Sequence, residues 1–122
     1  MLSSLFSKAP KMEWNKLSEV DQLEEIDKRS QEKPVVLFKH STRCSISSMA
    51  LSRFERSFKE DAEFEPYYLD LITNRDVSNL IAERYNVTHQ SPQAILIKNG
   101  KAIFDSSHTA IDFMELNEKA KN

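Results

Sequence analysis

The chain has 122 residues, which is enough for one domain with a hydrophobic core and too few for two. Its 17 Lys and Arg residues nearly balance 19 Asp and Glu residues, giving a formal charge of -2, and no block of like charge indicates a nucleic-acid or membrane partner. The single cysteine excludes an internal disulfide, and the sequence has no run of the roughly 18 apolar residues that a membrane span needs.

The amino end, residues 1–11, has no sustained periodicity, and we expect a flexible or loosely packed tail there. It lacks both a basic start and a continuous apolar stretch of about 7–15 residues, so it does not resemble a secretory signal. A lone thiol fits a reducing compartment. We therefore expect residues 1–122 to form a single, monomeric, cytoplasmic domain.

The first half of the chain predicts a helix, a strand and a second helix. A capping pattern at Ser18 and Asp21 opens a helix that runs to Arg29. Its apolar residues fall at helical spacing and predict one buried stripe: Val20, Leu23 and Ile26. Residues 34–39 are a short run rich in β-branched and aromatic residues that ends at Lys39 and shows no alternation, as in a central strand covered on both faces. From Cys44 to about Glu60 a helix is predicted with these residues facing inward: Ile46, Met49, Ala50, Phe54 and Phe58.

The second half predicts a strand, a helix, a hairpin and a last helix. Residues 66–71 form the strand, and Asn74 or Asp76 caps a helix with the apolar residues Val77, Leu80, Ile81 and Tyr85. Asn99-Gly100, between residues 93–98 and 101–106, is a strong hairpin signal. The last helix covers 111–121 with its apolar residues at Ile111, Met114, Leu116 and Ala120.

These elements predict an α/β fold with a mixed sheet of four to five strands. The first two strands are joined by a crossover helix and are parallel by the usual connection rule. The tight hairpin makes the last two antiparallel. Helices should cover both faces of the sheet.

Cys44 is the candidate for chemistry, because it lies where the central strand gives way to a helix. Most lone cysteines are simply buried apolar residues. Here the neighbours are polar, Arg43 adds a positive charge, and the first amides of a helix stabilise a thiolate. The carboxyl end of a strand is also where open α/β sheets bind ligands. We therefore interpret Cys44 as a reactive thiol.

Ser47 lies three residues after Cys44, where its N–H and its hydroxyl could reach the sulfur, although it could equally be an ordinary first-turn residue. A serine cannot resolve a mixed disulfide, so another thiol would have to release one formed at Cys44. Ser91-Pro92 precedes a strand, and its peptide bond is either cis, exposing backbone groups beside the thiol, or trans and merely the start of the strand.

The three histidines match no zinc signature and are accompanied by a single sulfur, so no metal site is expected. His40 could tune the thiol or position a substrate, or it could only pack at the end of its strand. His89 and His108 are interpreted as loop residues, with His108 the better candidate for a pocket neighbour. The only glycine lies in the hairpin turn, which argues against a phosphate-binding glycine loop.

Several blocks of the sequence resemble the monothiol bacilliredoxins, a thioredoxin-like family of the bacillithiol system. Residues 38–47, Phe-Lys-His-Ser-Thr-Arg-Cys-Ser-Ile-Ser, are similar to the family's K-H-S-T-x-C-P-I-S. Further matches, in the same order, are Tyr67-Tyr68-Leu69, residues 85–93, Asn99-Gly100 and Ser107-His108.

The resemblance implies a thioredoxin fold, Cys44 as nucleophile and Pro92 as a cis proline facing it. The candidate substrate-binding residues are then Arg43, Ser45, Ser47, Ser91 and Pro92. It also implies removal of bacillithiol, a low-molecular-weight thiol, from mixed disulfides with client proteins, with that thiol as co-substrate and no tightly bound cofactor. Ser45 stands where the family usually has proline, which restores a backbone N–H near the sulfur.

Two other functions would suit the same residues. A thioredoxin-like adaptor or redox-sensing binding module would dock partners through the same groove without catalysis. Monothiol glutaredoxins with a C-G-F-S turn carry an iron–sulfur cluster, but the glycine of that turn is missing here.

Overall fold

The computed structural model describes residues 12–121, and the predicted tail at residues 1–11 lies outside them. The strands are β1 (Asn15–Lys16), β2 (Val35–His40), β3 (Glu65–Asp70), β4 (Gln93–Lys98) and β5 (Lys101–Ser107). The helices are α2 (Gln22–Arg29), α3 (Ser45–Arg56), α4 (Arg75–Arg84), η1 (His108–Ala110, one 3-10 turn) and α5 (Phe113–Lys121). The predicted order of elements is confirmed, and the short strand β1 is an addition.

The strands form one mixed sheet in the order β1-β3-β2-β4-β5. β2 pairs with β3 in parallel and with β4 antiparallel, which places it at the centre. Every residue of β2 is buried. The apolar run 35–38 predicted this for its first four residues, and the polar Lys39 and His40 are buried as well. Asn99 and Gly100 have φ values of 52° and 73°, the left-handed pair that a two-residue hairpin between β4 and β5 requires.

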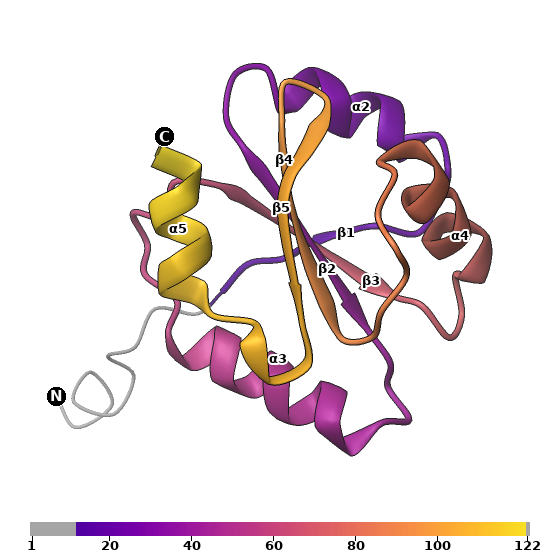
Figure 1. The fold of residues 1–122 in the computed structure, drawn as a ribbon, viewed down its shortest axis with the longest axis vertical. Helices are drawn as coiled ribbons and strands as arrows, with labels where there is room; N and C mark the ends of the chain where they lie inside the picture. The colour runs from indigo at the N-terminus through magenta and orange to yellow at the C-terminus, as the bar shows by residue number, and fades with distance from the viewer. Residues whose placement is uncertain (1–11, 122) are drawn as a thin grey trace, which may run out of the picture.

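Two helices cover each face of the sheet (Figure 1). α2 and α4 pack on the face that holds Val35 and Leu37, with Ile26 and Ile81 among their buried residues. α3 and α5 pack on the face that holds Val36 and Phe38. The aromatic side chains of this second core lie in contact as a group: Trp14, Phe38, Phe54, Phe64 and Phe113.

Four side chains predicted to be buried are exposed instead. They are Val20, Ile46, Met49 and Met114, with exposed fractions of 38%, 53%, 67% and 52%. In α3 the buried stripe runs through Ser47, Ala50 and Phe54. Because Ile46 and Met49 each precede a member of that stripe by one residue, they are turned about 100° away from it. The spacing alone was misleading because a serine occupies the first buried position.

The predicted helix starts are confirmed in position, but the capping hydrogen bonds are not formed. α2 begins at Gln22 and α4 at Arg75, so Asp21 and Asn74 are their N-cap residues, yet neither makes a side-chain capping hydrogen bond. Instead, the Gln22 side chain accepts the backbone N–H of Ser18 at 2.8 Å. α3 ends at Arg56 rather than near Glu60, and Ile111 is buried ahead of α5.

Candidate functional site

Cys44 is the N-cap residue of α3 and lies beyond the carboxyl end of β2. Its backbone is extended, with φ -113° and ψ 122°, and its carbonyl accepts the N–H of Ser48 at 3.0 Å. The side chain is half-buried and makes no capping hydrogen bond with the first-turn amides. The sulfur is therefore partly accessible to a reactant at the start of a helix.

Ser47 does not direct its hydroxyl to the sulfur as the spacing suggested. It is fully buried, and its Oγ lies 2.7 Å from Nδ1 of His40 and 3.0 Å from the backbone N of Ser41. Ser41 N–H donates to this oxygen, so the hydroxyl hydrogen can be donated to the imidazole. The three residues tie the end of β2 to the first turn of α3 and so fix the turn that holds Cys44.

His40 is buried beside Tyr68, with a 5.8 Å separation of the rings. Burial lowers the pKa of His40, while Asp70 and Glu55 oppose that shift. If the His40 ring were protonated, its Nδ1 would become a donor instead of an acceptor. The Ser47 oxygen, which already accepts the N–H of Ser41, would then face two donors. The neutral imidazole is thus the form that this site accommodates.

We expect the free energy of unfolding to decrease as the pH falls through about 6.5, the usual pKa of histidine in an unfolded chain. Because the folded-state pKa of His40 is lower, the unfolded chain takes up its proton first. In His40→Asn the Oδ1 atom can replace Nδ1 but does not titrate, so the decrease should be smaller. Urea denaturation at pH 7.5 and 5.5 measures it, and equal decreases in both proteins would contradict the assignment.

Ser91 and Pro92 lie at the start of β4, next to the end of β2. Lys39 of β2 is paired with Gln93, so the residues just before Gln93 lie level with those just after Lys39. The Ser91–Pro92 bond is cis. Ser91 is half-buried, and its Oγ has no hydrogen-bond partner among the described residues.

His108 joins this region from the other side. Its backbone N–H donates to the carbonyl of Pro92 at 3.0 Å, and its φ is 56°. An apolar hollow lies between its segment and the first three turns of α3. It is lined by Ile46, Met49, Ala50, Arg53, His108 and Thr109. Arg53 donates to the carbonyl of Ile111 at 3.3 Å, which ties α3 to the segment after β5. His108 therefore lines this hollow, and its place beside a substrate pocket at Cys44 stays a prediction.

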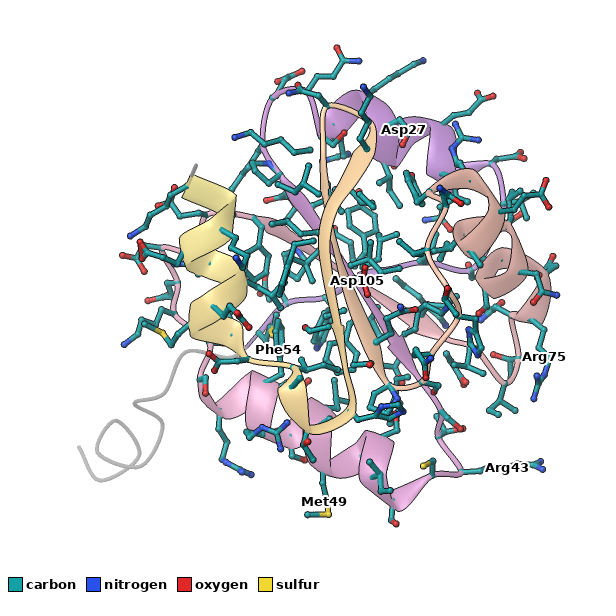
Figure 2. The ribbon with its side chains drawn as sticks, in the orientation of Figure 1. Asp27, Arg43, Met49, Phe54, Arg75 and Asp105 are labelled. Carbon is teal, nitrogen blue, oxygen red and sulfur yellow. The ribbon has the colours of Figure 1, made fainter. Side chains whose placement is uncertain are left out.

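Arg43 and Ser45, the neighbours of Cys44, are both exposed. The Arg43 side chain extends away from the body of the protein, as does Met49 farther along α3 (Figure 2). None of the described residues forms an ion pair or a hydrogen bond with the Arg43 guanidinium. Its charge is therefore presented to whatever approaches the site.

Sequence reasoning missed one contact of this region. Nζ of Lys39, on β2, lies 2.7 Å from Nδ1 of His89, in the loop that leads to Ser91. The sequence by itself indicates only that His89 is a loop residue. A lysine inside an otherwise apolar strand was the available signal, but its partner is 50 positions away in the chain.

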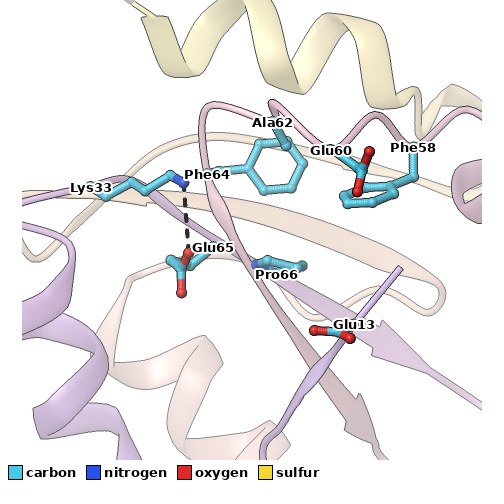
Figure 3. Close-up of a pocket in the computed structure, with 8 residues that line it drawn as sticks. All are labelled: Glu13, Lys33, Phe58, Glu60, Ala62, Phe64, Glu65 and Pro66. Atoms are coloured by element: carbon cyan, nitrogen blue, oxygen red, sulfur yellow. Dashed lines mark ion pairs between the residues drawn. The ribbon is translucent and has the colours of Figure 1, made fainter. Parts of the chain in front are cut away.

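A second hollow lies at the opposite end of the sheet (Figure 3). Its lining residues include Lys33, Glu65, Phe58 and Phe64. Lys33 Nζ and Glu65 Oε2 form an ion pair at 3.7 Å. Glu65 is level with Val35 at the start of β2, whereas Cys44 follows its end. This hollow therefore lies apart from the thiol.

Within residues 12–121, no group of three His, Cys, Asp or Glu side chains is placed to hold a metal ion. None of the helices described is both long and apolar enough to cross a membrane.

Comparison with known proteins identifies the family. The sequence profile described as "Monothiol bacilliredoxin BrxC" matches residues 15–116. This chain belongs to the monothiol bacilliredoxin family. The match spans every site residue of this bacilliredoxin-family chain discussed above, including Cys44 and Pro92.

Solved structures establish the fold of this bacilliredoxin-family protein. One, described as "A putative oxidoreductase with a thioredoxin fold", is 36% identical to this chain. It covers 88% of this chain and 92% of its own, with a TM-score of 0.75. Thioredoxin of Malassezia sympodialis is 19% identical, with coverages of 92% and 91% and a TM-score of 0.70. Thioredoxin f of spinach chloroplast is 17% identical, with coverages of 90% and 88% and a TM-score of 0.71. The fold is that of thioredoxin.

Proposed function

We propose that this protein is a monothiol disulfide reductase that removes bacillithiol, or a similar low-molecular-weight thiol, from mixed disulfides with client proteins. The observation that supports this most directly is the position of Cys44. It is the chain's one thiol, half-buried at the N-cap of α3, within the segment that matches the family. Ser47, one turn later, has no sulfur and a hydroxyl that is already bonded.

The exchange proceeds in two thiol–disulfide steps. The Cys44 thiolate attacks the small-thiol sulfur of the mixed disulfide, forming a disulfide between Cys44 and the small thiol. The client leaves as a thiolate, which takes up a proton. A second thiol then attacks the small-thiol sulfur, forms a disulfide with it and releases the Cys44 thiolate.

The surrounding residues have proposed roles in binding. Backbone groups at Ser91 and Pro92 would align the disulfide, because they lie at the start of β4 beside the end of β2. Arg43 and Ser45 are exposed on either side of Cys44 and would contact a charged small thiol or a client protein. Ser47 and His40 are buried and would act indirectly, because their hydrogen bond fixes the turn that holds the sulfur.

Transfer to Cys44 tests this function directly. The reduced protein is mixed with a client protein that has been bacillithiolated, and intact-mass and peptide mass spectrometry follow the small thiol. We expect the mass of bacillithiol to appear on the peptide containing Cys44 while the client thiol is released. Lack of transfer, with transfer intact in an established bacilliredoxin under the same conditions, would disprove the proposal.

A binding module is the second candidate, and the exposed Ile46 and Met49 beside Cys44 favour it. The two side chains line the same apolar hollow, and contiguous exposed apolar surface marks sites of protein interaction. Such a module would bind a bacillithiolated client with Cys44 unmodified. The same mass measurement therefore separates the two functions.

A further inference from the structure

Lys39 occupies an unusual position in the sheet. It lies on the central strand β2, its side chain is fully buried, and by strand alternation it shares the face of Val35 and Leu37. Its neighbours across the sheet are Leu69 on β3 and Gln93 on β4. A buried ammonium is costly without a partner. Among residues 12–121 no carboxylate forms an ion pair with it, so its partner must be of another kind.

That partner is the imidazole of His89, whose Nδ1 lies 2.7 Å from Lys39 Nζ. Gln93, the buried neighbour on β4, contacts the same loop. Its Nε2 donates to the carbonyl of Thr88 at 3.0 Å, and its Oε1 accepts the N–H of Gln90 at 3.3 Å. Two buried polar side chains of adjacent strands thus bind three consecutive residues of one loop. That loop leads directly to Ser91 and Pro92.

The charges of the pair make the hydrogen bond depend on pH. Burial lowers the pKa of Lys39 to about 8. Burial, Lys39 and, from α4, Arg75 all lower the pKa of His89. Near pH 7 a charged donor therefore faces a neutral acceptor, which is the stronger kind of hydrogen bond. At lower pH two cations oppose each other, and above about 8 the ammonium is lost.

We propose that Lys39 and His89 are positioning residues for the disulfide substrate. Their hydrogen bond holds residues 88–92 against the end of β2, and so sets where Ser91 and Pro92 meet a disulfide bound at Cys44. The inference rests on the proposed reductase function. The pair acts on substrate alignment, whereas the reactivity of the sulfur depends on its own helix.

The test compares four proteins: wild type, Lys39→Met, His89→Leu and His89→Asn. Methionine keeps the length of the buried lysine stem without its charge, and asparagine keeps an acceptor near the place of Nδ1. Losing a hydrogen bond to a charged group changes an equilibrium constant by roughly tenfold or more. We expect KM for a bacillithiolated peptide to rise by about that factor in Lys39→Met and His89→Leu. His89→Asn should stay close to wild type.

Two readouts separate this role from a general loss of structure. Alkylation of Cys44 by iodoacetamide needs no substrate alignment and should stay within about twofold in all four proteins. Amide hydrogen exchange at residues 88–91 should accelerate in Lys39→Met and His89→Leu, while the exchange of β2 stays slow. The KM difference between wild type and Lys39→Met should be largest near pH 7.

The outcomes are distinct from those of the functional proposal. Unchanged exchange at residues 88–91 in Lys39→Met would overturn the inference whether or not the protein transfers bacillithiol. An unchanged KM in Lys39→Met, with transfer by the wild type intact, would also overturn the inference. So would a rate of Cys44 alkylation that falls in parallel with the rate of turnover. If the wild-type protein transfers no bacillithiol, the reductase function and the substrate-positioning role are disproved together. The hydrogen-exchange measurement then tests only whether the Lys39–His89 hydrogen bond anchors the loop.

Discussion

Replacing Cys44 with serine should reduce the removal of bacillithiol from a client to the rate seen without protein. An oxygen cannot form the mixed disulfide through which exchange proceeds, and the chain of 122 residues contains no second cysteine to take over. The fold should persist, because serine is a favourable N-cap residue and position 44 is only half-buried. Release of client thiol, followed with a chromogenic disulfide, measures the loss, and thermal unfolding verifies the fold.

A relocated thiol provides the matched control. Ser52 is exposed on the same helix, eight residues after Cys44. The double variant Cys44→Ser, Ser52→Cys therefore has one accessible thiol that lies away from the helix start and from Pro92. We expect it to remain inactive. Wild-type activity in this variant would show that any exposed thiol suffices and that the geometry around Cys44 is unimportant.

Replacing Phe54 with alanine should give the largest loss of stability. Phe54 is 1% exposed on α3 and lies at the centre of the aromatic core. Its ring centroid is 5.2 Å from that of Phe38, 5.4 Å from Phe113 and 5.9 Å from Trp14. Truncating a buried phenylalanine costs about 3–5 kcal/mol, which is a large part of the 5–15 kcal/mol typical of a domain.

Urea denaturation of Phe54→Ala measures this cost, with Met49→Ala as the control on the same helix. Met49 is 67% exposed, so its truncation should change the free energy of unfolding by no more than about 0.5 kcal/mol. Similar losses in the two variants would mean that α3 packs on the sheet through a different face. The comparison thus also tests the corrected assignment of the buried stripe.

The candidate site was predictable only in part from the sequence. Cys44 stood out because it is unique and follows an apolar strand, and the family match covers it. The spacing left open whether the hydroxyl of Ser47 reaches that sulfur, and in the structure it bonds to His40. Sequence spacing gives the distance between residues along a helix. It does not reveal which side chain of a neighbouring strand forms a hydrogen bond with the Ser47 hydroxyl.

The order of strands and helices, the antiparallel hairpin at Asn99-Gly100 and the position of Cys44 at a helix start follow from the sequence itself. Each depends on residues close together in the chain, where periodicity and turn propensity act. The tertiary structure alone decided that Ser47 rather than Ile46 faces inward, and that Lys39 meets His89. Those contacts join residues 7 and 50 positions apart on different elements, so they exist only once the sheet and its helices have packed.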